Sequence, residues 1–358
     1  MLEKVFDFFI WLGIFLGDVL EFGLKAIIIV IAFALCVKIL QKIKPSLDKR
    51  KIKIENLKEK YEKYENQFYH KTLNKKELKN YLIQKKASHS KKKSFWKKGF
   101  SKSSTKELSL KKSPKLFVLS FKGDIMASEV KHLREEISLI IKLFKKEDEV
   151  VLLLNSRGGS VSHYGLAANQ LQRLRNNQIP LTVCVDEVAG SGGYLMACIG
   201  NKILASPFAM VGSIGVFCGV PNIHDFLKKN DISYEEFTAG KYKRTVTPMG
   251  KVTEEKKKQL QEQLNLVHTQ FKNFVKKYRN INLEEVATGE VWLAEEALKK
   301  GLVDQLKCSD DFILEKIKSH QVYKISFKKE KTLLDKLPKM NLLQKNMVED
   351  FFRQDLII

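Results

Sequence analysis

The sequence predicts an α/β fold with a parallel sheet of βαβ units, preceded by a transmembrane helix and a lysine-rich linker. Three observations support this prediction. Short apolar runs alternate with helix-forming runs from Leu116 onward, as in right-handed βαβ units. Two of these apolar runs, Val150–Leu154 and Leu181–Val185, each end in a glycine-containing turn that opens a helix. The third observation is an uncharged apolar segment near the N-terminus.

The apolar N-terminal segment predicts a membrane anchor over residues 1–44. Its uncharged run Ala26–Val37 is too short to cross a bilayer, but it extends to Phe22–Leu40 if Lys25 and Lys38 reach toward the interface. That length of about 19 residues is close to the roughly 20 that a bilayer core requires. No small-residue cleavage site follows, so we expect a retained anchor. The alternative, a buried core helix, is disfavoured by the basic residues that follow.

Charge on either side of this segment predicts its orientation. Acidic residues precede the helix, and lysine and arginine dominate after it. The positive-inside rule then predicts a single-pass helix with its N-terminus outside and the rest of the chain in the cytoplasm.

Residues 45–114 are expected to form a charged helical stalk and a lysine-rich linker. The formal net charge is +23, and much of it lies between Lys85 and Lys115, where Glu107 is the single acid. Phe95, Trp96 and Phe100 within this run would suit a nucleic-acid interface. No nucleic-acid module accompanies them, so we interpret the run as a solvated or lipid-facing linker. Membrane lipid, and not nucleic acid, is therefore the expected partner.

The compact domain is expected over residues 115–325, and an amphipathic tail over 326–358. Apolar runs predict the strands, and longer runs with helical apolar spacing predict the helices. In chain order, the expected elements are strand Leu116–Phe121, helix Ala127–Phe144, strand Val150–Leu154, helix His163–Asn176, strand Leu181–Val185, helix Gly193–Ile199, strand Lys202–Ala205, turn Gly212–Val216, helix Asn222–Asn230, strand Ser233–Thr238, helix Thr253–Tyr278 and helical cover over Leu283–Asp304. The tail would pack on this domain or on a membrane surface.

The five cysteines predict no special chemistry. They are scattered, and none forms a CxxC pair. They are interpreted as small buried hydrophobic residues, without a disulfide framework or a zinc site. No metal and no cofactor is expected.

Ser191 is the candidate nucleophile. It lies between Gly190 and Gly192, where an apolar strand passes into a helix, so its hydroxyl can stand among backbone N–H groups. The turn with Gly158 and Gly159 follows the preceding strand. In a parallel sheet both turns reach the same edge, which is where such sheets bind ligands.

The base that would activate Ser191 is not decided by composition or spacing. His224, His268 and His320 stand in contexts that suit structural or exposed histidines. A lysine can act as a base when burial lowers its pKa. The glycine-containing loop 238–245 offers Lys241 and Lys243, with a solvated charge run as the alternative reading.

Four motifs in order resemble the signal peptide peptidase A family of serine–lysine proteases. They are Asn155–Ser160, Ala189–Tyr194, Val211–Val216 and Thr238–Thr245, and the late element Lys299–Asp304 is also similar. The anchor, the linker and the run Gly165–Arg175 resemble the SohB-type inner-membrane proteases of Gram-negative bacteria. The resemblance covers roughly Phe117 to Asp304 by motif and the N-terminal third by architecture.

The resemblance implies a Clp/crotonase-type superhelical fold and a role for each matching residue. Ser191 matches the nucleophile, and Lys243, at 243 − 191 = 52 positions further on, matches the general base. The oxyanion hole is expected from the backbone N–H groups of Gly158, Gly159 and Gly192. Ser213 would orient the lysine amine.

The family also implies a homo-oligomeric ring in which serine and lysine can come from adjacent subunits. The implied substrates are membrane-derived peptides, including cleaved signal peptides.

Two departures and three alternatives accompany this resemblance. Arg157 stands where the family commonly has proline, and Gly190 where it has alanine, which loosens the turns beside the nucleophile. A crotonase-type acyl-CoA enzyme would use the same fold without a nucleophilic serine. A non-catalytic membrane scaffold would leave Lys243 solvated. A Clp-like Ser/His/Asp protease would need a histidine at a strand end.

Overall fold

The structure, a computed structural model, describes residues 51–85, 113–240 and 243–328. From Ile52 onward these residues belong to one compact unit. The expected anchor over 1–44, most of the lysine-rich linker and the tail beyond residue 328 lie outside the described residues. Among the helices of the described ranges, none has both the length and the apolar composition needed to cross a membrane.

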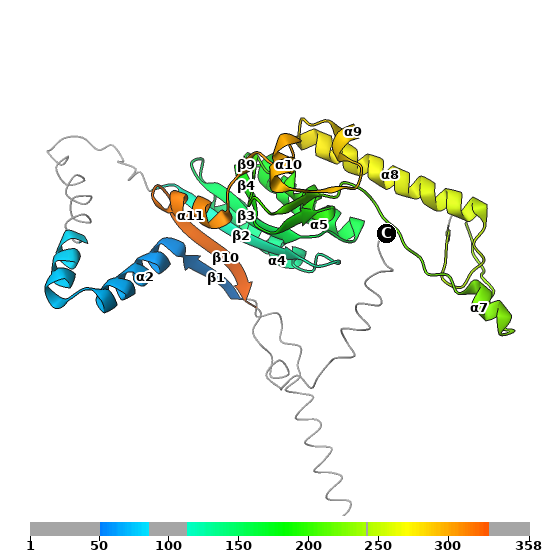
Figure 1. The fold of residues 1–358 in the computed structure, drawn as a ribbon, viewed down its shortest axis with the longest axis horizontal. Helices are drawn as coiled ribbons and strands as arrows, with labels where there is room; N and C mark the ends of the chain where they lie inside the picture. Colours follow the sequence, from blue (N-terminus) through cyan, green and yellow to red (C-terminus); the bar gives the residue numbers. More distant parts are fainter. Residues whose placement is uncertain (1–50, 86–112, 241–242, 329–358) are drawn as a thin grey trace, which may run out of the picture. The chain divides into compact units, whose positions relative to one another are not determined.

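A largely parallel sheet forms the centre of the fold (Figure 1). Its main path runs β1-β10-β2-β3-β4-β6-β9, and the pairings from β10 to β9 are all parallel. The bounds are β1 Lys51–Asn56, β2 Lys115–Gly123, β3 Glu149–Ser156, β4 Leu181–Val185, β6 Lys202–Ala205, β9 Gln305–Leu306 and β10 Gln321–Lys328. The predicted α/β class with a central sheet is confirmed.

Three short strands extend the sheet beside the end of β3. β5 (Val188–Gly190) pairs with β3 through Ala189 and Ser156, and β7 (Met210–Gly212) lies parallel to β5. β8 (Val291–Leu293) closes this extension in antiparallel register with β7. The extension brings the turns that follow β3, β5 and β7 to one edge.

Helices cover the sheet on both faces. Their bounds are α2 Leu57–Thr72, α4 Val130–Leu143, α5 Val161–Asn176, α6 Gly192–Ala197, α7 His224–Lys229, α8 Glu254–Tyr278, α9 Leu283–Val286, α10 Ala294–Lys299 and α11 Ser309–Ile317. Thr253 caps α8, because its side chain accepts a hydrogen bond from the Lys256 amide.

Alternation along β2 divides the core between the two faces. Phe117, Leu119 and Phe121 belong to the large core cluster, which includes apolar residues of α4 and α5. Leu116 and Val118 belong to a second cluster, which includes residues of α11. Side chains of a strand alternate between faces, and burial of each large one stabilises the fold by roughly 1.5–3 kcal/mol.

Three expectations about secondary structure are corrected. Ser233–Thr238 is not a strand. Phe237 within it is 88% exposed and the preceding Ile232 is 53% exposed, so no core holds an extended pairing there. The helix expected from Ala127 begins at Val130, because Ala127 has φ +46° and Asp124 accepts hydrogen bonds from Ser128. The expected helical stalk begins with β1, an edge strand on β10.

Cys184 and Cys198 are buried free thiols. Burial raises the pKa of both, that of Cys184 to about 12. Both thiols are therefore protonated at neutral pH, in agreement with the expected role as small hydrophobic residues.

The C-terminal end of α8 is held by an ion pair that involves the late motif Lys299–Asp304. Arg279 donates from both terminal nitrogens to Asp304, at 2.9 and 2.8 Å, and also to Gly301 O at 2.8 Å. The same carboxylate accepts the Ile203 amide of β6 at 2.7 Å. Burial alone would raise the pKa of Asp304, but the hydrogen bonds from Arg279 and Ile203 hold it below its usual value. Asp304 therefore ties α8 to the sheet.

Removing this carboxylate should destabilise the fold. Asp304→Ala leaves the Arg279 guanidinium and the Ile203 amide without their acceptor, so we expect the free energy of unfolding to fall by about 2–3 kcal/mol. Glu296→Ala is the matched control, because it removes an exposed ion pair with Lys299. Urea denaturation measures both variants. Equal midpoints for the two variants would show that Asp304 does not anchor α8.

Candidate active site

Ser191 occupies a constrained turn between β5 and α6. Its backbone has φ +50° and ψ −119°, a region that non-glycine residues rarely adopt and that costs of order 1–3 kcal/mol. The turn is held because the Ser191 amide donates to Gly212 O at 2.8 Å and the Ser191 carbonyl accepts from the Leu195 amide at 2.9 Å. The hydroxyl makes no capping hydrogen bond to α6. It is therefore available to a bound molecule.

The turn after β3 packs directly on Ser191. Gly158 has φ +94°, and a Cβ there would lie 2.6 Å from Gly192 N and 2.7 Å from Ser191 Cβ. Only glycine allows this approach. At Gly190, a methyl group would lie 3.3 Å from Arg157 O, so alanine would be tight at this position. The two departures noted in the sequence, Arg157 and Gly190, are thus in near contact.

Two backbone N–H groups beside Ser191 are without an acceptor. Among the residues that the structure describes, none accepts a hydrogen bond from Gly159 N or Gly192 N. Gly158 differs from expectation, because its amide already donates to Ser156 Oγ at 3.1 Å. Of the three glycine amides expected to form an oxyanion hole, those of Gly159 and Gly192 are therefore free in this conformation.

A directional chain of hydrogen bonds supports this turn. Tyr164 Oη donates to Asp124 O at 2.7 Å, so Ser156 Oγ must donate to Tyr164 Oη across 2.6 Å. Ser156 Oγ in turn accepts the Gly158 amide. The Tyr164 ring also packs on Gly192, where a Cβ would lie 2.4 Å from Cγ of the ring. Tyr164 therefore fixes the turn and α6 together.

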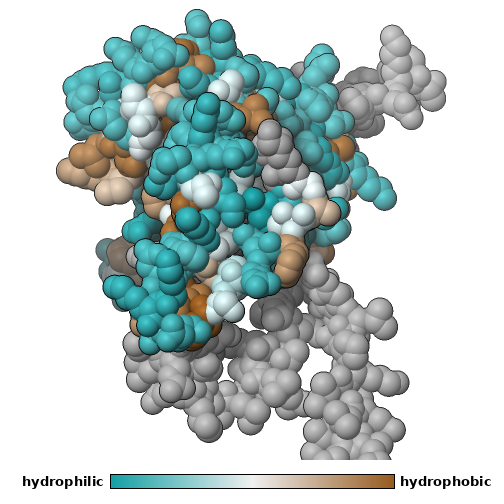
Figure 2. Space-filling view, turned by 90° about the vertical axis from the view of Figure 1, so that its right-hand side faces the viewer, coloured by the Kyte–Doolittle hydropathy of each residue, from teal (hydrophilic) through white to brown (hydrophobic). Residues whose placement is uncertain are grey.

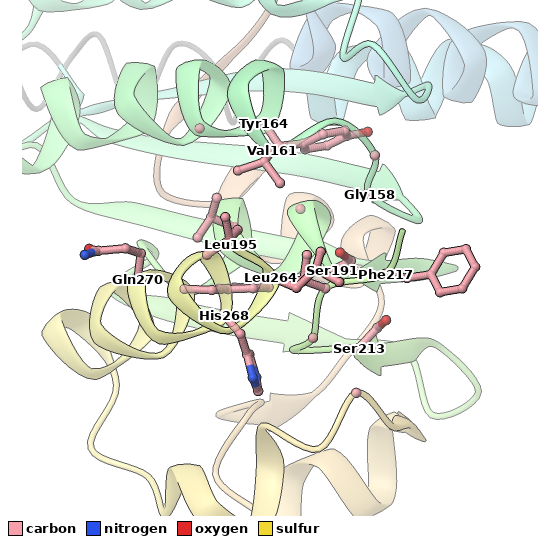
Figure 3. Close-up of a pocket in the computed structure, with 18 of the residues that line it drawn as sticks. Gly158, Val161, Tyr164, Ser191, Leu195, Ser213, Phe217, Leu264, His268 and Gln270 are labelled. Carbon is pink, nitrogen blue, oxygen red and sulfur yellow. The ribbon is translucent and has the colours of Figure 1, made fainter. Parts of the chain in front are cut away.

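The Ser191 hydroxyl opens into a cavity of about 950 Å³ between α5, α6 and α8. Figure 3 shows Val161 and Tyr164 on one side, Leu264 and His268 on the other, and Leu195 between them. Ser213 lines the same cavity, on the turn after β7. Its backbone has φ +53°, and its amide donates to Glu290 O at 2.6 Å. The structure thus brings Ser191, Ser213 and the three glycines to one site.

Lys243 is not among the residues that line this cavity. Its side chain is exposed, and its amide donates to Gly240 O at 3.1 Å. Lys241 lies outside the described residues. A single chain therefore does not bring the expected base to the expected nucleophile.

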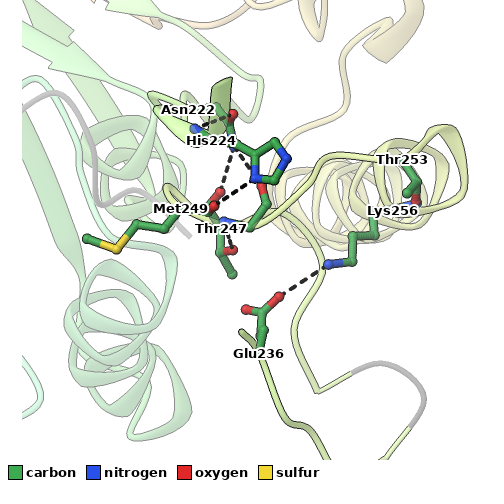
Figure 4. A network of polar contacts seen from close by, with 8 residues as sticks. Asn222, His224, Glu236, Thr247, Met249, Thr253 and Lys256 are labelled. Carbon is green, nitrogen blue, oxygen red and sulfur yellow. Dashed lines mark hydrogen bonds and ion pairs between the residues drawn. The ribbon is translucent and has the colours of Figure 1, made fainter. Parts of the chain in front are cut away.

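Lys243 is carried by a projecting segment, residues 217–250, which we call the arm (Figure 1). At the base of the arm, Asn222 Nδ2 donates to Thr247 O and Gly250 O at 3.0 and 2.9 Å, and His224 Nδ1 lies 3.2 Å from Met249 O (Figure 4). Lys256 of α8 pairs with Glu236 at 3.2 Å. These contacts hold the two legs of the arm to each other and to α8.

The arm exposes large apolar side chains. Phe217, Phe226 and Phe237 are 68%, 64% and 88% exposed. Figure 2 looks at this end of the molecule and shows brown apolar patches among the teal surface. The arm therefore leaves apolar side chains exposed in the single chain.

His268 lines the cavity and was not expected there. It lies on α8 one turn from Leu264 and close to Phe271, so a helical projection of this stretch could have grouped the three on one face. Its Nε2 lies 3.2 Å from Ile214 O. A carbonyl only accepts, so this bond assigns the proton to Nε2. His268 therefore holds the turn after β7.

Comparison with known proteins places both halves of the chain in one family. The model for the N-terminal region of peptidase family S49 matches residues 13–171, and the model for peptidase family S49 matches residues 173–323.

Individual relatives agree with these matches. The putative protease SohB of Buchnera aphidicola subsp. Baizongia pistaciae is 51% identical over 63% of this chain and 64% of its own. The probable protease SohB of Haemophilus influenzae is 49% identical over 62% and 63%. That of Buchnera aphidicola subsp. Schizaphis graminum is 43% identical over 76% and 77%. The match spans slightly less than two thirds of the first two relatives.

The hydrogen-bond chain through Tyr164 predicts a stability effect. Tyr164→Phe keeps the ring on Gly192 but leaves Ser156 Oγ without an acceptor and Asp124 O without a donor. Because Ser156 is buried, its unpaired hydroxyl is costly, and we expect the free energy of unfolding to fall by about 1–3 kcal/mol. Urea denaturation measures the loss, with Tyr234→Phe, at an exposed tyrosine, as the control. An unchanged midpoint in Tyr164→Phe would rule out this supporting role.

Proposed function

Because the chain belongs to peptidase family S49, we propose that it is a serine endopeptidase whose nucleophile is Ser191. One observation carries the proposal. Ser191 lines a cavity from a strained turn, and Gly159 and Gly192, which line the same cavity, have amides that no described residue engages. Two such donors can stabilise the negative oxygen that forms when a hydroxyl attacks a carbonyl, and loss of one typically costs roughly 10²–10³ in rate. We also propose that the fold is of the Clp/crotonase type.

In the proposed mechanism, the neutral amine of Lys243 takes the proton of the Ser191 hydroxyl. The Ser191 oxygen attacks the peptide carbonyl carbon, and the tetrahedral oxyanion accepts hydrogen bonds from Gly159 and Gly192. The amine returns the proton to the leaving nitrogen, which releases one peptide product and leaves an acyl-enzyme. Water, activated by the same amine, hydrolyses the ester. Gly158 has no side chain, which allows its turn to pack on Ser191. Ser213 orients the amine of Lys243.

We propose that Lys243 acts on Ser191 of a neighbouring copy in a homo-oligomeric ring. Two observations support this. Lys243 does not line the cavity of its own chain, and it is carried on an arm with exposed phenylalanines that need cover. Burial of the arm against a neighbour would remove water from the amine, and desolvation lowers the pKa of a lysine. The same contact would therefore both deliver the base and make it neutral.

The proposed membrane anchor, substrates and domain bounds rest on the sequence. The apolar segment within residues 1–44 would anchor the chain once in a bacterial inner membrane, with the domain on the cytoplasmic side. Substrates would be membrane-derived peptides or cleaved signal peptides. Residues 45–114 would link the anchor to the peptidase domain, 115–325, and the tail would follow from 326.

The dyad is tested by single substitutions in the full chain. We expect Ser191→Ala and Lys243→Ala each to lower kcat/KM for peptide hydrolysis by at least about 10³-fold. Lys251→Ala, which removes another exposed lysine near the arm, should leave turnover unchanged. His268→Gln tests the rival base, because glutamine can still donate to Ile214 O. Full activity in Lys243→Ala, together with loss of activity in His268→Gln, would show that His268 and not Lys243 is the general base.

Sharing of the site between copies is tested by mixing inactive variants. When Ser191→Ala and Lys243→Ala chains are co-assembled in equal amounts, a shared site pairs the intact Ser191 of one variant with the intact Lys243 of the other. About one quarter of the sites in a symmetric ring are then complete. Hydrolysis of a peptide substrate by the mixture should recover to about that fraction. Co-assembly without recovered activity would place both residues in one chain.

A further inference from the structure

The cavity beside Ser191 extends well beyond the reacting groups. Its walls are mostly apolar, with Val161 on α5, Leu195 on α6, and Leu264, Phe271 and Phe274 on α8. Two small residues of α5, Gly165 and Ala168, lie on the same wall as Val161. They are one helical turn apart, so together they leave a hollow along α5.

The polar groups of the cavity give its interior no free charge. Tyr164 Oη and His268 Nε2 are each engaged with a backbone carbonyl, Asp124 O and Ile214 O. Arg157 is exposed, so its charge remains in water. A charged side chain that entered the interior would lose its solvation without a partner. The interior is therefore suited to an apolar group.

Gly165 is unlike the other glycines of the site. A Cβ at Gly165 would meet no atom within 4 Å, and its φ lies outside the left-handed region. By contrast, a Cβ at Gly158, Gly159 or Gly192 would collide with backbone or with a ring. Of the glycines that the structure describes, Gly165 alone has neither a backbone nor a packing reason to be glycine.

Glycine at this position carries a cost. Gly165 is the fifth residue of the 16-residue helix α5, and glycine inside a helix destabilises it relative to alanine. What the glycine provides in return is unfilled space in the wall of the cavity that contains Ser191. A residue that weakens its helix and leaves a binding cavity open is best explained by what the cavity holds.

We infer that Gly165 determines the specificity of this site by keeping open a subsite for a large apolar side chain. The side chain is that of the substrate residue whose carbonyl Ser191 attacks, because the cavity opens at the Ser191 hydroxyl. The inference rests on the proposed peptidase function and adds to it a substrate class, peptides with leucine- or phenylalanine-sized apolar residues before the cleaved bond. Ala168 deepens the same subsite.

Peptide substrates that differ only in that residue test the inference. The full chain should cleave the leucine and phenylalanine substrates at least about 10-fold better, in kcat/KM, than the alanine substrate. Gly165→Leu fills the hollow, so we expect kcat/KM for the two large substrates to fall by about 10- to 100-fold. The alanine substrate, which does not need the hollow, should be cleaved within about 3-fold of the wild-type rate.

Two further variants control for folding. Gly165→Ala removes the helix-interior glycine with little loss of space, so its Tm should rise by about 2 °C. Its kcat/KM for the phenylalanine substrate should fall slightly. Asn169→Leu adds leucine to an exposed position of α5 outside the cavity. It should change neither the leucine-to-alanine nor the phenylalanine-to-alanine ratio of kcat/KM. If Gly165→Leu does not fold, the decision rests on whether Gly165→Ala lowers the phenylalanine-to-alanine ratio.

The outcomes separate this inference from the proposed function. An active wild type whose large-to-small ratio is the same in Gly165→Leu, or that prefers the alanine substrate, overturns the subsite and leaves the peptidase standing. A wild type that cleaves no substrate, and whose Ser191 is not labelled by a fluorophosphonate, overturns the peptidase and the subsite together.

Discussion

The site depends on one steric constraint, the contact of Gly158 with Ser191 and Gly192. The turn after β3 can touch the turn after β5 only because Gly158 has no side chain. That contact exists because β5 pairs with the end of β3, so that two parallel strands deliver their turns to one edge. β7 completes the arrangement, since its Gly212 carbonyl accepts the Ser191 amide and holds the strained backbone. This packing brings Gly159 and Gly192, whose amides have no acceptor among the described residues, to the cavity that Ser191 lines.

A second level of the structure determines what can reach that hydroxyl. Helix α8 forms one wall of the cavity, and the Arg279–Asp304 ion pair ties its end to β6. The arm precedes α8 and carries Lys243, which does not line the cavity of its own chain. The same helix thus shapes the binding cavity and supports the segment that would supply the base. The proposed oligomer would explain, with one contact, both the exposed phenylalanines and the absence of Lys243 from the cavity lining.

Much of the sheet, and the place of Ser191 in a turn at the end of a strand, could be predicted from the sequence because both follow local rules. Buried parallel strands are apolar runs, and a serine among glycines at a strand end indicates an exposed hydroxyl. The three-residue strands β5, β7 and β8 are too short to show a period, so they were missed. The Gly158 amide was expected to be free, but it donates to the Ser156 hydroxyl, which is ordered by Tyr164, eight residues after Ser156. The cavity position of His268 and the empty space over Gly165 depend on contacts between distant segments, which no local pattern encodes.

The most direct measurement is a structure of the full chain with a peptide phosphonate bound covalently to Ser191. We expect one phosphonyl oxygen within about 3.1 Å of both Gly159 N and Gly192 N. We also expect the amine of residue 243 from an adjacent copy beside the Ser191 oxygen, and the apolar side chain of the inhibitor along α5. An adduct whose oxygens all point to solvent, away from both amides, would rule out the proposed oxyanion site.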